Sequence, residues 1–220
     1  MLEKFSIDEF MIRVMPGGVF LAVLYFLYGK YFSLAITESN DLLYTFIFFC
    51  VSFIIGELLQ TLAHESEWII DIFFKFRRPS EIFLYKNNPV LKSDHQRNNV
   101  IKHLKLSEDE KQIFNTDYKK LSFLKVWKID RGNNAISQSI FWTLYSQVSD
   151  LDEIKTSNRG YLFVRVTMLL FLLITILLFI NYNINLGLIS LGVFIIFLWR
   201  SRGYARGLVF KIVLLNLKKK

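Results

Sequence analysis

Four apolar stretches divide the chain, and each approaches the length needed to cross a lipid bilayer. A spanning helix needs about 20 mainly apolar residues, and the hydrophobic stretches cover residues 15–36, 42–63, 161–182 and 184–199. The last two are separated by only a few residues around Asn183, which predicts a tight antiparallel hairpin. The pattern therefore predicts an all-α membrane protein with four transmembrane helices.

The segment between the second and third spans, residues 64–160, is polar and long enough to form a domain, with 16 Lys and Arg against 13 Asp and Glu. Ser107 and Glu110 fit a capping box, which predicts a helix running on to Leu124. Apolar residues at helical spacing predict a second helix between Ile136 and Leu151. We expect a small, mainly helical domain in this segment.

The distribution of charge predicts the topology. The last 21 residues carry seven Lys and Arg and no acidic residue, whereas the hairpin between the last two spans is uncharged. Basic residues concentrate on the cytoplasmic side of membrane proteins, so both termini and the polar domain are expected in the cytoplasm. The predicted divisions are an N-terminal interfacial segment with helices 1 and 2 (1–63), a cytoplasmic domain (64–160), a transmembrane hairpin (161–199) and a basic interfacial tail that binds anionic lipid headgroups (200–220).

Composition agrees with the membrane class and excludes several kinds of site. Hydrophobic residues make up 53% of the chain, with 22 Phe, and the net charge of +8 is read first as a topology signal. The single cysteine, Cys50, excludes an intrachain disulfide and a Cys-rich metal site. The first residues mix charges of both signs, so no cleavable signal is expected. The HExxH, GxGxxG, Walker and GxSxG patterns are absent, and we expect neither a catalytic residue nor a metal or cofactor.

A polar face interrupts the second span. Glu57, Gln60, Thr61 and His64 share one side of a helix, because residues three, four and seven apart lie on the same face. A charged side chain costs about 2.5 to 3.5 kcal/mol at the centre of a spanning helix, so Glu57 is expected to face protein or water. Arg165 enters the third span at a similar depth. The face is therefore either a polar clamp between Glu57 and Arg165 or part of a hydrated path repeated around an oligomer axis.

Basic residues and histidines in the polar domain form a second candidate site. A cluster that follows the second span, together with residues around the sequence DHQRNNVIKH, has the charge to receive a phosphate-bearing ligand such as a nucleotide. A solvated charged surface has the same composition. The ligand-binding candidates are Lys75, Arg77, Arg78, Lys86, Lys92, His95, Arg97, Lys102, His103 and Lys105.

Three features resemble small four-span membrane effectors of bacterial anti-phage defence. They are the PGG sequence opening the first span, the GELLQ sequence near the end of the second, and the polar insertion before a closing helical hairpin. The resemblance implies an inner-membrane protein that opens or disrupts the membrane on a cytosolic signal. It also implies that Pro16, Gly17 and Gly18 pack helices, and that Gly56, Glu57 and Gln60 belong to a pore.

These observations favour an oligomeric membrane effector or channel whose cytoplasmic domain senses a cytosolic protein or a nucleotide signal. Symmetry would multiply each intramembrane polar group into a ring, which explains how one chain can carry so few of them. The first alternative is a non-catalytic membrane anchor or scaffold for a cytosolic partner. The second is a lipid-active enzyme that uses the region of His64.

Overall fold

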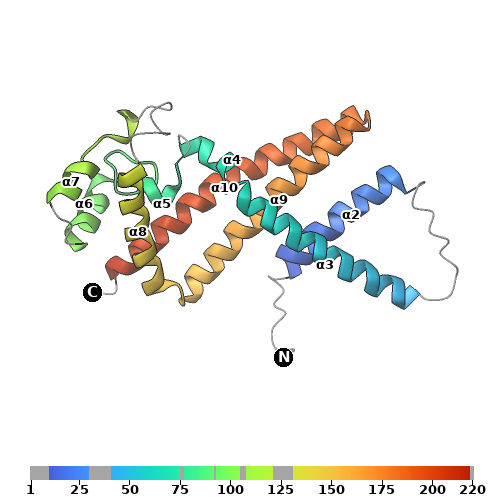
Figure 1. The fold of residues 1–220 in the computed structure, drawn as a ribbon, viewed down its shortest axis with the longest axis horizontal. Coiled ribbons are helices and arrows are strands. Elements are labelled where there is room, and N and C mark those ends of the chain that lie inside the picture. The colour runs from blue at the N-terminus through green and yellow to red at the C-terminus, as the bar shows by residue number, and fades with distance from the viewer. Residues whose placement is uncertain are drawn as a thin grey trace. The chain divides into compact units, whose positions relative to one another are not determined.

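The computed structural model describes residues 10–29, 41–74, 77–91, 93–104, 108–120 and 131–218. Within these ranges the regular structure is helical and contains no strand. Four helical segments are long and apolar enough to cross a membrane: Phe10–Tyr28, Leu42–Phe74, Asp152–Ile180 and Ile184–Lys218. The predicted all-α fold with four helices long and apolar enough to span a membrane is confirmed within the described residues. The helices divide into two compact units (Figure 1), and each is described by itself.

Unit 1 takes its described residues from Met1–Glu67 and Leu162–Ser201. Its core consists of apolar side chains from α3 and α9 with partly buried side chains of α2, among them Leu59, Ala63 and Val166. The elements are a π-helical turn η1 (Phe10–Val14), α2 (Met15–Tyr28), α3 (Asp41–Glu65), and the parts of α9 (Asp152–Ile180) and α10 (Ile184–Lys218) that fall in these ranges.

The predicted hairpin between the last two spans is confirmed. A short turn separates the end of α9 at Ile180 from the start of α10 at Ile184, and Tyr182 adopts a φ of 57° in it. Inside the membrane segment the two helices are joined by a hydrogen bond of 2.9 Å from the Thr175 hydroxyl to the Ser190 hydroxyl. Both hydroxyls are therefore satisfied within the chain, as hydrocarbon surroundings require.

Unit 2 takes its described residues from Trp68–Tyr161 and Arg202–Lys220. The N–H of Tyr118 donates to the carbonyl of Lys86 and the N–H of Lys86 to that of Thr116, which ties distant loops together. Asn87 adopts a φ of 55° two residues before Pro89. The remaining elements are α4 (Trp68–Asp71), the 3-10 turns Ile72–Phe74 and Tyr118–Lys120, α5 (Pro79–Ile82), α6 (Asp94–His103), α7 (Glu108–Phe114) and α8 (Arg131–Val148).

The helix predicted from Ser107 to Leu124 is wrong in its extent. The structure ends α7 at Phe114 and places Tyr118 in a separate 3-10 turn, while Ser107 and Leu124 lie outside the described residues. The physical reason is a competing set of hydrogen bonds. The guanidinium of Arg97 donates to the Phe114 carbonyl and to the Asn115 side chain, and the N–H of Tyr118, which would donate to Phe114 in a continuing helix, donates to the Lys86 carbonyl instead. The helix predicted from Ile136 to Leu151 corresponds to α8.

The C-terminal segment differs from the predicted interfacial tail. Helix α10 continues from the fourth span to Lys218, and Val209, Ile212 and Val213 are buried within unit 2. The Asn216 side chain donates to the carbonyl of Leu144 in α8. Apolar residues that the sequence pattern assigned to the lipid interface are thus covered by protein. Binding of anionic headgroups by the basic residues of this segment stays a prediction.

Candidate functional site

Helix α3, which carries the polar face, crosses η1 and α2 in direct backbone contact. A Cβ added at Gly17 would overlap the carbonyl oxygen of Ser52, and one added at Gly56 would overlap the carbonyl oxygen of Arg13. Small residues allow this approach, as in other membrane helix pairs. A Cβ added at Gly18 would make only ordinary contacts, the nearest at 3.6 Å to the Ser52 hydroxyl oxygen. The packing role is therefore confirmed for Gly17, and Gly56 packs as well.

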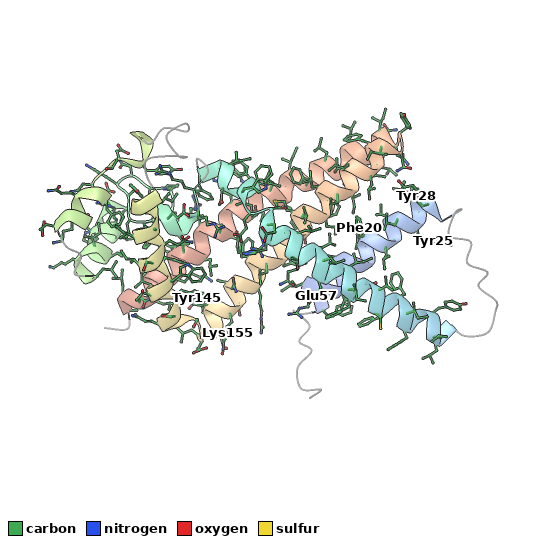
Figure 2. All side chains as sticks on the ribbon, viewed as in Figure 1. Phe20, Tyr25, Tyr28, Glu57, Tyr145 and Lys155 are labelled. Atoms are coloured by element: carbon green, nitrogen blue, oxygen red, sulfur yellow. The ribbon has the colours of Figure 1, made fainter. Side chains whose placement is uncertain are left out.

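Next to this crossing, Arg13 and Glu57 form an ion pair across the two helices. The Arg13 Nη1 atom lies 2.9 Å from Glu57 Oε1, and the side chains are 38% and 39% exposed. Figure 2 shows Glu57 near the beginning of α2. Arg13 is held in the π-helical turn η1, a form of helix found often at functional sites. A pair with this much exposed surface needs water or protein around it, because hydrocarbon solvates neither charge.

The rest of the predicted polar face lies along α3, and its members differ in surroundings. Gln60 is partly buried, and its side-chain oxygen has no hydrogen-bond partner among the described residues. The Thr61 hydroxyl donates to the carbonyl of Glu57 at 3.0 Å. His64 is largely exposed, with Nδ1 3.8 Å from Glu67 Oε1. Helix α3 ends at Glu65, one residue after His64.

Arg165 is not the partner of Glu57. Its guanidinium donates to the carboxylate of Glu67, directly after α3, and the Arg165 side chain is only 5% exposed. A clamp between helices is thus present, but between Arg165 and Glu67, while Glu57 pairs with Arg13. Sequence reasoning missed both new partners. One feature of the sequence could have identified Arg13 as a partner. It lies one helical turn before the PGG sequence, and Gly17 of that sequence brings this part of the chain against α3.

The basic candidates of unit 2 separate into buried and exposed groups. Arg77 is buried with its guanidinium 6.0 Å from the ring centre of Tyr85. Arg97 is also buried. The remaining candidates that the structure describes are exposed: Arg78, Lys86, His95 and Lys102. Lys75, Lys92 and Lys105 and the side chain of His103 lie outside the described residues. Whether any of these residues binds a phosphate-bearing ligand stays a prediction.

Arg97 is a structural residue by its geometry. Its side chain is buried and donates from Nε to the Leu84 carbonyl and from Nη2 to the Phe114 carbonyl, both at 2.6 Å. Burial lowers the pKa of the guanidinium below its ordinary value, although nearby Asp94 acts in the opposite direction. Burial similarly raises the pKa of the Tyr118 phenol, against the opposing charges of Arg77 and Arg202.

The described residues contain no group of three or more His, Cys, Asp or Glu side chains arranged to hold a metal ion. No protein-family model, curated protein or solved structure matches the chain. The resemblance to defence effectors therefore stays a prediction.

Proposed function

We propose that the protein is an oligomeric membrane effector that opens a polar path through the bilayer when a cytosolic signal or partner engages unit 2. In this proposal the chain lies in a bacterial inner membrane with both termini in the cytoplasm, as its basic residues predict. The role in anti-phage defence rests on the resemblance of the PGG and GELLQ features alone.

The observation that carries the proposal is the exposure of the Arg13–Glu57 ion pair. Glu57 lies 16 residues from the start of α3 at Asp41, or about 24 Å along the helix. With Asp41 at one boundary of a hydrocarbon core about 30 Å thick, Glu57 would lie inside that core. More than a third of each side chain is open in the single chain. Neighbouring copies and water between them would provide the solvation that lipid cannot.

A shared path is favoured over a path within one chain. The groove between α2, α9 and α10 in unit 1, with a volume of about 410 Å³, is lined by apolar side chains and by Ser190. The Ser190 hydroxyl is already bonded to Thr175 and to the Phe171 carbonyl. This groove therefore offers an ion no ligand. The Arg13–Glu57 pair with Gln60 is the polar surface that symmetry would turn into a ring.

Ion flux through liposomes tests the proposal. Purified protein should show a basal ion flux without its cytosolic signal, and Glu57→Gln should leave Arg13 without its counter-charge in every copy. The added positive charge should lower the cation-to-anion permeability ratio about fivefold, corresponding to about 1 kcal/mol for a charge near the ion in a hydrated path. The measurement is the reversal potential across a salt gradient.

Glu65→Gln is the matched control, because it makes the same chemical change eight residues further along α3, at the exposed end of the helix. It should leave the permeability ratio close to that of the unchanged protein. Equal ratios for Glu57→Gln and the unchanged protein, with the assembly intact, would contradict a path lined by Glu57.

The alternative is a membrane anchor that holds a cytosolic partner through unit 2. The Arg165–Glu67 pair favours this alternative. The charge of Arg165, in the third predicted span, is paired with Glu67 of the same chain, so it needs no second copy as a partner. An anchor should show no ion flux under any trigger. A pulldown with the full chain should then recover one dominant partner, and Glu57→Gln should leave that recovery unchanged.

A further inference from the structure

The groove of unit 1 lies between three helices that are long and apolar enough to cross a membrane. Its walls run from Val19 to Phe26 on α2, from Phe171 to Leu178 on α9 and from Leu186 to Val193 on α10. Each wall therefore extends about 10 Å along its helix. Inside a bilayer, a groove formed by these helices is surrounded by hydrocarbon rather than by water.

The lining of the groove has no polar group to offer a ligand. Its side chains are apolar apart from Ser190, whose hydroxyl donates to the Phe171 carbonyl and accepts from Thr175. Polar groups of a ligand buried here would stay without hydrogen-bond partners, which costs free energy. A hydrocarbon chain has no such groups. The chemistry of the lining therefore selects an apolar occupant.

One polar group lies beyond the end of the groove that is nearest the α9–α10 turn. The side-chain N–H of Asn181 donates to the hydroxyl oxygen of Tyr28 at 2.7 Å, which joins the ends of α9 and α2. A phenol also has one proton to donate, and no described residue accepts that of Tyr28. Figure 2 shows Tyr28 at the end of α2. The apolar groove thus ends at a hydrogen-bond donor.

We propose that the groove binds one acyl chain of a glycerophospholipid, with an ester carbonyl of that lipid accepting the Tyr28 proton. Such a lipid has hydrocarbon in the interior of the membrane and hydrogen-bond acceptors at its boundary. Tyr28 lies beside the polar turn that joins two spans, and tyrosine is enriched at membrane boundaries. The inference requires the chain to span a membrane. It requires neither ion conduction nor an oligomer, so it can fail independently of the proposed function.

A helix of a second copy fits the groove less well than an acyl chain. A helix with its side chains is about 10 to 12 Å across, so a 10 Å length of it fills roughly 800 Å³ or more. The groove has a volume of about 410 Å³. A helix would therefore contact the rim and leave the lining atoms beneath it without neighbours, at the cost of their dispersion contacts. A hydrocarbon chain is narrow enough to reach them.

Packing and one hydrogen bond would favour occupation of the groove. Lipid tails are as apolar as leucine side chains, so an acyl chain gains no hydrophobic free energy on moving from the bilayer to the groove. An empty groove would deprive Ile174 and Leu178 of contacts on one side. Lipid is also in large excess in a membrane, so weak binding is sufficient for high occupancy.

Photo-cross-linking in liposomes tests the site. The full chain is reconstituted with a phosphatidylcholine that carries a diazirine near the middle of one acyl chain, and the labelled residues are mapped by mass spectrometry. We expect label on Val23 and on Ile174, which line the groove, although Ile174 is only 4% exposed. Lipid that merely surrounds the helices would label exposed Ile196 and leave Ile174 unlabelled. That second pattern would overturn the proposal.

Two matched pairs of variants test the groove and its polar end separately. Ile189→Trp puts a larger side chain at the groove wall and should lower the labelling of Ile174 severalfold. Ile196→Trp should not, although the two positions on α10 are 64% and 63% exposed. Tyr28→Phe should also lower this labelling severalfold, whereas Tyr25→Phe, at an exposed tyrosine of the same helix, should leave it unchanged. Equal labelling of Ile174 in all four variants would contradict the proposal.

A second probe distinguishes the possible occupants. A free fatty acid with the same diazirine, at the same concentration in the membrane, should label Ile174 severalfold less, because its ionised carboxylate loses more hydration than a neutral ester does. Stronger labelling by the fatty acid would overturn the assignment to a phospholipid. Absence of label at Ile174 together with a smaller assembly for Ile189→Trp would show that a second copy of the chain occupies the groove instead.

Discussion

Gly56→Ala is expected to destabilise unit 1 more than a Gly→Ala substitution at any other described glycine of that unit. The new Cβ would overlap the backbone oxygen of Arg13, and backbone atoms cannot move aside as a flexible side chain can. Overpacking of a well-packed site costs about 1 to 3 kcal/mol, and we expect the upper end or more here. Thermal unfolding of the purified full chain in detergent measures the loss.

Gly18→Ala is the matched control for this substitution. It adds the same methyl group on α2, where the nearest atoms are 3.6 Å away or more. Its melting temperature should stay within a few degrees of the unchanged protein. Gly192→Ala, with no atom within 4 Å of the added Cβ, should behave in the same way. If Gly56→Ala melted together with these two controls, η1 and α3 would not make the backbone contact described.

Arg97→Ala is expected to unfold much of unit 2. The substitution removes the donors for two buried carbonyl groups, those of Leu84 and Phe114, and leaves a cavity where the guanidinium was. Unsatisfied buried polar groups cost about 1 to 3 kcal/mol each, so the total loss should reach about 3 to 5 kcal/mol. Amide hydrogen exchange in α6 and α7 should rise strongly while exchange in α2 and α3 stays unchanged.

Arg97→Lys separates the role of the charge from that of the geometry. Lysine keeps the positive charge, but its compact ammonium group lacks the planar fork that reaches both carbonyl oxygens. We expect it to recover only a small part of the lost stability. Lys102→Met, at an exposed position on the same helix, should have little effect. Full stability of Arg97→Lys would show that the two carbonyl bonds matter less than the charge.

The spans and the hairpin were predictable from sequence because hydrophobic length and the short turn near Asn183 depend on local composition. Helix α8 was predictable for a similar reason, since its apolar residues repeat at helical spacing. The end of α7 was not, because Arg97, 17 residues before Phe114, takes the carbonyl at which the helix stops. The continuation of α10 into unit 2 was also missed, since apolar residues facing protein and facing lipid have the same pattern.

The polar site was only partly predictable, for a different reason. Sequence places Glu57, Gln60 and Thr61 on one helical face, but it does not say which helix that face meets. The partner of Glu57 depends on where α2 and α3 touch, and Gly17 and Gly56 fix that point beside Arg13. Similar depth in the membrane, the argument that suggested Arg165, is a weaker constraint than this backbone contact.

In the proposed assembly, further copies of the chain would cover the exposed Arg13–Glu57 pair. The most direct test is the mass of the protein particle, measured by native mass spectrometry after reconstitution in lipid nanodiscs large enough for several copies. We expect a uniform assembly of more than one chain, with one chain having a mass of 26.0 kDa. A stable particle containing a single chain, at every protein-to-lipid ratio tried, would contradict a shared polar path.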